Sequence, residues 1–236
     1  MKVDVCFSPA LYPYYADNNN YIVVVVDIFR ATTTMCAALK NGANCIIPVA
    51  SIEEAQQYKA KGYLVGAERN VKRCDFADFG NSPFDYTKEK VEGKEIVFTT
   101  TNGTQAIEAA ANADVLTIGA FSNISALTEF CIQKQKDVMI LCAGWNNRFN
   151  IEDTLFGGAL AERLVVKGYA SASDATKVAL SMWQEAKSEL KSYINRTEHI
   201  KRLEANNLQD SVEYCLTVDT ANLVPLYDNV NKVLKL

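Results

Sequence analysis

Short apolar segments alternate with segments of helical character through the first two-thirds of this 236-residue chain. The apolar segments are rich in Val, Ile and Leu, as is typical of strands that are buried on both faces. They are Tyr21–Val26, Cys45–Val49, Tyr63–Gly66, Glu95–Phe98, Val115–Ile118 and Val138–Cys142, and the helical segments are Thr33–Lys40, Ile52–Lys61, Thr104–Ala111, Ile124–Gln133 and Glu152–Val166. This alternation predicts a layered α/β/α fold around a largely parallel or mixed sheet.

The final third is predicted to be helical. Apolar residues recur at helical spacing from Asp174 to Ile194, which predicts one long amphipathic helix, and a second helix is expected near Glu198–Asn206. Val212–Val218 fits a strand or a helix equally well. Because no Gly/Ser-rich linker and no repeat interrupts the chain, we expect residues 1–236 to form one compact α/β unit, or two lobes without a firm boundary.

Charge and cysteine usage narrow the class of protein. The formal net charge is −4, so binding of nucleic acid through its phosphates is not expected, although a local pocket can still bind a small anion. The seven cysteines form no Cys-x-x-Cys pair, which indicates free thiols in a reducing compartment. There is no secretory signal and no apolar run long enough to cross a bilayer. We therefore expect a cytoplasmic protein that binds no membrane and that forms a homodimer if it self-associates.

Chemically capable residues follow four of the predicted strands. The carboxyl ends of parallel strands meet at one edge of a sheet, where ligands bind in open α/β folds, so these residues predict a single site for a small anion. The residues concerned are Asp27 and Arg30 after the first strand, Glu68 and Arg69 after the third, Thr99–Thr104 after the fourth, and Cys142, Arg148, Glu152 and Asp153 after the last.

The segment Thr99–Thr104 is predicted to hold the anion. A glycine lets the backbone approach a ligand closely, and the first N–H groups of the helix that follows have no partner within the helix. Thr101, Asn102, Gly103 and Thr104 are therefore candidate binding residues. The alternative is an ordinary turn with a helix cap.

Asp27, Glu68 and Asp153 are predicted to hold Mg²⁺. A carboxylate at a buried strand end is costly unless it is paired or binds a metal, and Mg²⁺ needs only one or two carboxylates besides water and a substrate phosphate. Arg30 is expected to bind the anionic substrate, with Arg69 and Arg148 as further candidates. The alternative is an ion pair between Asp27 and Arg30.

Two residues are candidates for chemistry beyond metal binding. Glu152 is the candidate general base, although acidic residues in the first turn of a helix are common for electrostatic reasons. Cys142 and Arg148 have the Cys-x₅-Arg spacing of thiol phosphatases, which makes Cys142 a candidate nucleophile; a buried packing role is the alternative. His199, the only histidine, is expected to be a surface or structural residue.

These segments together resemble the 2-phosphosulfolactate phosphatase family. The stretches that carry the resemblance are Val26–Thr34, Gly66–Arg69, Gly80–Pro83, Thr99–Thr104, Cys142–Gly144 and Glu152–Leu155, with a weaker match through Asp210, Val218–Asp219 and Val224–Pro225. The resemblance implies a Mg²⁺-dependent phosphatase that converts 2-phosphosulfolactate to sulfolactate and phosphate, as in coenzyme M biosynthesis. Two alternatives remain: a phosphatase that uses Cys142 as nucleophile, and a non-catalytic protein that binds small anionic metabolites.

Overall fold

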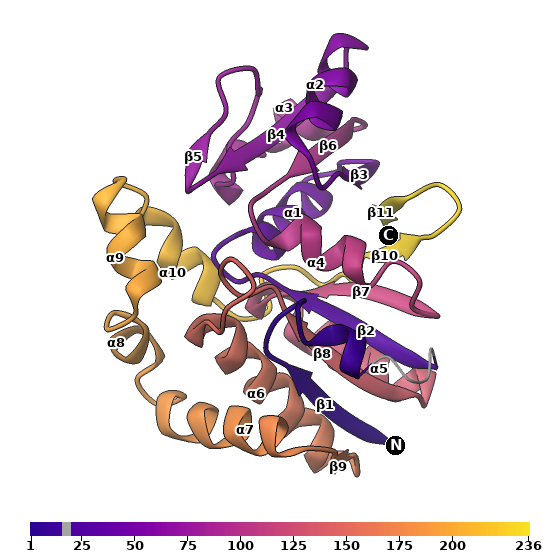
Figure 1. Cartoon of the computed structure of the whole chain (residues 1–236), viewed down its shortest axis with the longest axis vertical. Coiled ribbons are helices and arrows are strands. Elements are labelled where there is room, and N and C mark those ends of the chain that lie inside the picture. The colour runs from indigo at the N-terminus through magenta and orange to yellow at the C-terminus, as the bar shows by residue number, and fades with distance from the viewer. Residues whose placement is uncertain (16–19) are drawn as a thin grey trace.

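The computed structural model describes residues 1–15 and 20–236, and its strands form one 11-stranded sheet in the order β5-β4-β6-β3-β11-β10-β7-β2-β8-β1-β9 (Figure 1). The strands are β1 (Lys2–Cys6), β2 (Tyr21–Val26), β3 (Cys45–Pro48), β4 (Leu64–Arg69), β5 (Lys72–Arg73), β6 (Glu95–Thr99), β7 (Val115–Gly119), β8 (Asp137–Cys142), β9 (Ala170–Ser171), β10 (Leu226–Asp228) and β11 (Val233–Lys235).

The sheet consists of two parallel blocks joined by an antiparallel hairpin. Strands β7, β2, β8, β1 and β9 run parallel, and so do β3, β6 and β4. The hairpin β10–β11 lies between the blocks, where Leu226 pairs with Thr117 of β7 and Leu234 pairs with Ile46 of β3. The predicted layered α/β fold is confirmed, and its sheet is mixed.

Helices cover both faces of the sheet because the strands are apolar on both faces. In β2, Ile22 and Val24 pack in one core with α5 and α6, whereas Val23 and Val25 pack in another core with α1 and α4. The helices are α1 (Ala31–Lys40), α2 (Ile52–Ala60), α3 (Lys88–Val91), α4 (Gly103–Ala109), α5 (Ile124–Lys134), α6 (Ile151–Val166), α7 (Asp174–Ala186), α8 (Leu190–Ile194), α9 (Glu198–Ala205) and α10 (Asp210–Leu216), with 3₁₀ turns at Tyr12–Tyr14, Pro83–Asp85 and Phe121–Asn123.

The C-terminal third is mainly helical, as predicted, but it also contains the strands β9, β10 and β11, which were not predicted. The single helix expected from Asp174 to Ile194 is wrong, because α7 ends at Ala186 and α8 begins at Leu190. No glycine or proline marks this break in the sequence. Tertiary contacts hold the end of α7 instead, since Glu162 of α6 accepts hydrogen bonds from Trp183 Nε1 and Lys187 Nζ. The ambiguous segment 212–218 belongs mainly to helix α10.

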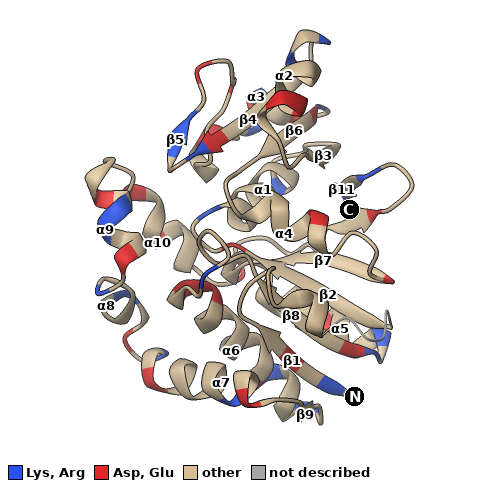
Figure 2. Ribbon diagram, in the orientation of Figure 1, with Lys and Arg blue, Asp and Glu red and all other residues tan. Residues whose placement is uncertain are grey.

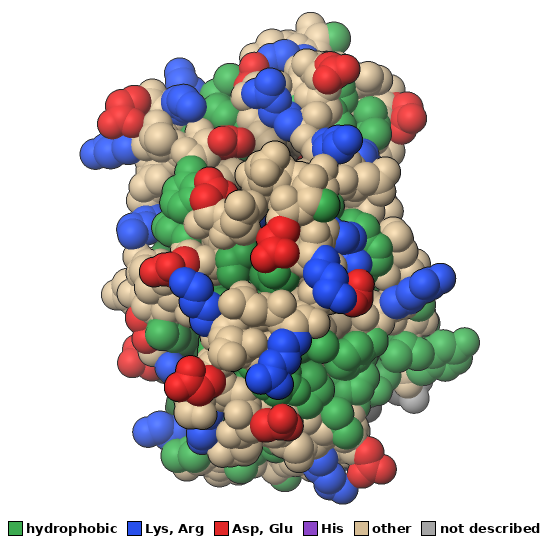
Figure 3. Space-filling view, turned by 90° about the vertical axis from the view of Figure 1, so that its left-hand side faces the viewer, with side chains coloured by type: hydrophobic (Ala, Val, Ile, Leu, Met, Phe, Trp, Pro, Cys, Tyr) green, Lys and Arg blue, Asp and Glu red, His purple; other side chains and the backbone are tan. Residues whose placement is uncertain are grey.

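Two neighbouring strands inside the sheet are free of charged residues. Figure 2 shows that β2 and β7 carry none, which agrees with their burial inside the sheet. Acidic and basic side chains are interspersed over the face that carries α8, α9 and α10 (Figure 3). Across residues 1–15 and 20–236, every helix is too short or too polar to cross a membrane.

Leu234→Ala is expected to lower the free energy of unfolding by about 2–4 kcal/mol, because Leu234 of the bridging hairpin is completely buried against both blocks. Urea denaturation followed by circular dichroism measures the loss. Leu236→Ala is the control, since that side chain is 67% exposed and should change stability little. Equal effects of the two substitutions would contradict a structural role for the hairpin.

Candidate functional site

A small polar cavity of about 10 Å³ lies beyond the carboxyl ends of the strands, which is space for roughly one water-sized particle. Segments distant in sequence meet around it. Its lining comprises Asp27, Phe29, Arg30, Glu68, Val71, Asn81, Asn102, Trp145, His199 and Leu203. Thus four of the predicted residues, Asp27, Arg30, Glu68 and Asn102, share one cavity with a histidine and a second asparagine.

Asp27 is fixed by the turn that connects β2 to α1. Its N–H donates to Thr32 Oγ1 at 3.0 Å, and its Oδ1 accepts from the N–H of Ala31 at 3.2 Å. Burial raises the pKa of this carboxyl to about 6, although His199 and the Ala31 N–H oppose the increase. Gly103 leaves room for it, since a Cβ at that position would lie 2.8 Å from Asp27 Oδ2. The protein therefore holds a buried acid whose charge is incompletely compensated.

Glu68 lies near the end of β4, and two of the predicted binding residues hold it in place. Its Oε1 accepts hydrogen bonds from the Val71 N–H at 2.5 Å and from Thr101 Oγ1 at 3.2 Å. Arg69 donates to the Glu68 carbonyl at 2.6 Å and to Thr99 Oγ1 at 2.8 Å, which ties β4 to β6. Thr101 and Arg69 thus lie behind the cavity and position Glu68.

Asn81 and Arg30 bring unused hydrogen-bonding capacity to the cavity. The Asn81 carbonyl accepts from Thr34 Oγ1, but its side-chain Oδ1 is fully buried without a hydrogen-bond partner in the described structure. The guanidinium of Arg30 is also buried and makes one hydrogen bond, to Ser211 Oγ at 3.2 Å, among the described residues. Its burial lowers the pKa of Arg30. A buried acceptor and a buried cation without full partners suit a site that binds a ligand.

His199 is the residue that the sequence interpretation missed. It lies on α9 with 6% of its surface exposed, and its Nδ1 is 2.5 Å from Glu152 Oε1. Its ring packs edge-on against Phe29 and Trp145, at centroid distances of 5.6 and 5.5 Å. Of the two expected roles, surface or structural, the surface one is therefore wrong. Glu152 is connected to the cavity through this histidine. Asn150 Nδ2 also donates a hydrogen bond to Glu152 Oε1, at 3.0 Å.

Asp153 does not line the cavity. Its Oδ1 accepts from the Ile28 N–H at 2.8 Å, and its Oδ2 accepts from the Gly144 N–H at 3.1 Å and from Asn150 Nδ2 at 2.8 Å. Burial and the nearby Asp27 raise the pKa of this carboxyl well above its ordinary value. Asp153 thus joins the loops that follow β2 and β8, and both of its oxygens are already used.

The remaining predicted residues lie around or away from the cavity. Asn102 Oδ1 accepts from the Asn146 N–H at 2.9 Å, whereas Thr104 Oγ1 bonds back to the Thr100 carbonyl. Cys142 is completely buried in the core, and burial raises the pKa of its thiol well above the ordinary value, which disfavours the thiolate that a nucleophile requires. Arg148, six residues further on, lies in a different pocket.

That second pocket adjoins the polar cavity. Its volume is about 300 Å³, and Trp145 and His199 line both spaces. The other residues around it include Arg148, Glu152 and Arg202. Together the small cavity and the larger pocket can hold an ion and a small metabolite side by side.

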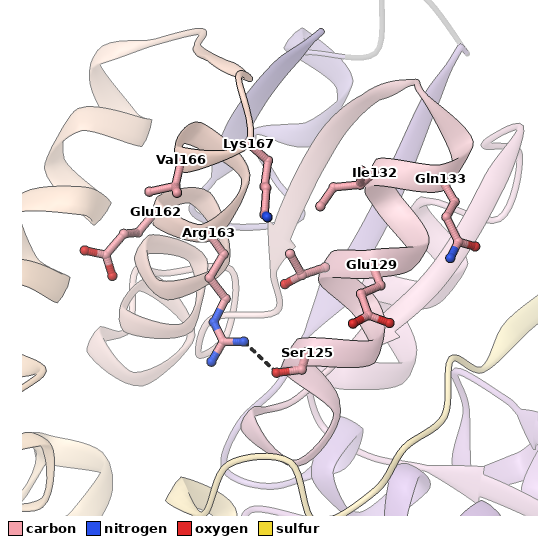
Figure 4. Close-up of a pocket in the computed structure, with 9 residues that line it drawn as sticks. Ser125, Glu129, Ile132, Gln133, Glu162, Arg163, Val166 and Lys167 are labelled. Carbon is pink, nitrogen blue, oxygen red and sulfur yellow. Dashed lines mark hydrogen bonds between the residues drawn. The ribbon is translucent and has the colours of Figure 1, made fainter.

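A larger cavity lies elsewhere in the molecule. Its volume is about 510 Å³, and Figure 4 shows the residues of α5 and α6 that line it. Arg163 donates a hydrogen bond across it to Ser125 Oγ at 2.7 Å. Its lining contains exposed helix residues such as Glu129 and Lys167, and none of the predicted site residues. Its size alone therefore does not make it the site.

The carboxylates alone do not form a metal centre. Among residues 1–15 and 20–236, no three His, Cys, Asp or Glu side chains are grouped as ligands of one ion. The two carboxylates that share the cavity, Asp27 and Glu68, are instead accompanied by the amide oxygen of Asn81. Any metal here would need neutral oxygen ligands as well.

Comparison with known proteins gives a consistent result across nearly the whole chain. A family model described as 2-phosphosulpholactate phosphatase matches residues 6–230. A Thermotoga maritima protein named probable 2-phosphosulfolactate phosphatase is 38% identical over 212 residues, which cover 90% of this chain and 91% of the other. Proteins with the same name from Caldanaerobacter subterraneus (36% identical over 211 residues, 88% of each chain) and Clostridium botulinum (31% identical over 243 residues, the full length of both) are also similar. The matched range includes every residue of the polar cavity.

Proposed function

This chain belongs to the 2-phosphosulfolactate phosphatase family, and from that premise we propose that it hydrolyses 2-phosphosulfolactate to sulfolactate and phosphate with the help of Mg²⁺. One structural observation supports the proposal most strongly. Asp27, Glu68 and Asn81 line a single cavity of ionic size, and the side-chain oxygen of Asn81 is buried without a hydrogen-bond partner in the described structure.

The residues around the cavity fit Mg²⁺. This ion prefers oxygen ligands, keeps several waters, and is commonly held by one or two carboxylates together with a substrate phosphate. Asp27, Glu68 and Asn81 would hold it, and Asn81 Oδ1 would then gain the partner that it lacks. A bound Mg²⁺ would supply positive charge that stabilises the phosphoryl oxygens and the departing oxygen.

The protein's own groups supply positioning and proton transfer. Arg30 would place its unpaired N–H groups against the phosphoryl oxygens, because its guanidinium lines the cavity and uses one donor on Ser211. His199 Nδ1 lies 2.5 Å from Glu152 Oε1, and a carboxylate there accepts a hydrogen bond from Nδ1, which leaves Nε2 as the ring nitrogen that can exchange a proton. With Nε2 protonated, His199 would give the Nε2 proton to the alcohol oxygen as the P–O bond breaks. Water would add to phosphorus at the same time, and the proton that the water loses would return to Nε2.

Release of inorganic phosphate from purified protein tests this function directly. We expect turnover of 2-phosphosulfolactate with Mg²⁺, loss of turnover in EDTA and recovery when Mg²⁺ is added back. A control with boiled protein excludes spontaneous hydrolysis. Saturable binding of 2-phosphosulfolactate without phosphate release would instead favour a non-catalytic binding protein.

Cys142→Ala is expected to retain phosphatase activity within about threefold, because complete burial disfavours the thiolate that nucleophilic attack would require. Initial rates with and without EDTA measure this, and thermal unfolding shows whether the variant is folded at the assay temperature. A folded Cys142→Ala protein without activity would support the thiol mechanism instead.

A further inference from the structure

The pocket of about 300 Å³ beside the polar cavity has the right place and size for most of a small substrate. The polar cavity of about 10 Å³ has no room for a three-carbon acid. A phosphate ester whose phosphoryl group approaches Asp27 and Glu68 must therefore extend past Trp145 and His199, which line both spaces. The non-reacting end of the substrate then lies in the larger pocket.

In this pocket the carboxylates have charged or hydrogen-bonding partners, whereas the arginines have no ion-pair partner among the described residues. Both of its carboxylates have partners, since Glu152 binds His199 and Glu198 is 2.6 Å from Lys201 Nζ. Its two arginines, Arg148 and Arg202, form no ion pair among the described residues. The pocket thus offers unpaired positive charge in a protein whose formal net charge is −4.

Arg202 is the better placed of the two arginines. Its guanidinium carbon lies 4.2 Å from the centre of the Trp145 ring, and its Nε is fully buried without a hydrogen-bond partner in the described structure. Stacking on an aromatic face fixes the guanidinium plane and leaves its edge for an acidic group. Trp145 is itself held by two backbone hydrogen bonds with Arg148, each 2.9 Å long. Arg202 is therefore held on the Trp145 ring, its Nε has no partner in the described structure, and its terminal N–H groups are the ones that a ligand in the pocket could reach.

We infer that this pocket binds a second acidic group of the substrate, a carboxylate or sulfonate, and that Arg202 on its Trp145 platform is the residue that selects for it. The inference rests on the proposed function and assigns the residue that recognises one of the acidic groups of its substrate. A guanidinium binds either group through charge-assisted hydrogen bonds.

A matched pair of substrates tests the inference. Isopropyl phosphate is an ester of a secondary alcohol like 2-phosphosulfolactate, but it lacks both acidic groups. The measured quantity is the ratio of kcat/KM for 2-phosphosulfolactate over that for isopropyl phosphate. We expect Arg202→Met to reduce this ratio by about 10- to 100-fold, as for loss of a hydrogen-bonded charge. Arg202→Lys keeps the charge without the planar fork and should give a smaller loss.

Arg196→Met is the control. Arg196 is an exposed arginine between α8 and α9, and it lies outside the pocket. This substitution removes the same charge and should leave the ratio unchanged. Equal ratios in the wild type, Arg202→Met and Arg202→Lys would overturn the inference, and so would equal losses in Arg196→Met and Arg202→Met.

A binding measurement separates this inference from the proposed reaction. Calorimetric titration with sulfolactate requires no turnover, and we expect Arg202→Met to weaken its binding while Arg196→Met does not. If the wild type releases phosphate from no ester, the proposed function fails, and the sulfolactate titration still decides the role of Arg202. Undiminished binding of sulfolactate by Arg202→Met would overturn that role whether or not the protein is a phosphatase.

Discussion

Asp27→Asn is expected to lower phosphatase turnover by about 10³-fold and, at the same time, to make the metal-free protein more stable. In the proposed mechanism turnover falls because an amide cannot supply the negative charge that would bind Mg²⁺. Stability rises because the ionised Asp27 carboxylate is buried with few compensating partners, and burial raises its pKa to about 6. An amide keeps the acceptor for the Ala31 N–H and removes the buried charge.

The pH dependence of stability gives this prediction a defined sign. A raised pKa means that the folded protein binds the Asp27 proton more tightly than the unfolded chain does. The stabilisation by this proton is present below about pH 4 and is lost as the pH rises through about 6. The full change corresponds to about 3 kcal/mol as an upper figure. The variant should therefore gain its largest advantage above about pH 7 and almost none near pH 4.

Urea denaturation in EDTA at the two pH values measures this advantage. Asp75→Asn is the control, since Asp75 is exposed and lies outside the cavity. Excess Mg²⁺ should reverse the order at neutral pH, because binding to the wild type alone adds stability. A variant that retains near-normal turnover, or that is less stable than the wild type in EDTA, would contradict the role given to Asp27.

His199→Gln is expected to lower kcat by about 10²- to 10⁴-fold for substrates with poor leaving groups. The physical reason is the loss of the proton donor for the departing alcohol oxygen. An aryl phosphate has a leaving oxygen that needs no protonation, so the same variant should lose much less activity on p-nitrophenyl phosphate. Comparing the two substrates in steady-state assays distinguishes proton donation from a general loss of structure.

Glu152→Gln should reduce kcat less than His199→Gln does, because Glu152 acts through the histidine at 2.5 Å. The double variant should be no slower than His199→Gln alone, since residues that act as one unit show non-additive effects. Equal losses on both substrates in His199→Gln would assign the histidine a packing role against Phe29 and Trp145.

Six interior strands, β2, β3, β4, β6, β7 and β8, and the longer helices between them could be predicted from sequence, because each of these strands is an almost continuous apolar run. Strand β1, in which Lys2 and Asp4 alternate with apolar residues, was not predicted. Neither was the hairpin β10–β11. Its strands are Leu226–Asp228 and Val233–Lys235, and they pair with the rest of the sheet through single residues, Leu226 and Leu234. Such short strands form only because β3 and β7 are already there to receive them.

The part of the candidate site that lies at the ends of predicted strands could be predicted from the sequence. Asp27, Arg30, Glu68 and Asn102 all follow or end parallel strands, and the structure brings them to one cavity. Asp153 also follows a strand, but hydrogen bonds from backbone N–H groups, which no sequence pattern reveals, use both its oxygens. The role of Asp153 as a metal ligand therefore stays a prediction, which a measurement of metal binding tests.

His199 was missed because its partner Glu152 is 47 residues away in the chain. One signal was available. His199 and Leu203 are four residues apart, so they share a face of α9, and that face is buried. A histidine on the apolar side of an amphipathic helix needs a polar partner inside the protein.

The place of the hairpin in the sheet has a consequence for biosynthesis. Residues 226–235 fill the gap between β3 and β7. Until the ribosome has released them, both of those strands remain open edges that can pair with other nascent chains and seed aggregates. Because residues 226–235 are synthesised after β3 and β7, the incomplete chain needs another protein to cover those two strand edges. A chain that terminates before residue 226 should therefore be insoluble rather than a less active enzyme.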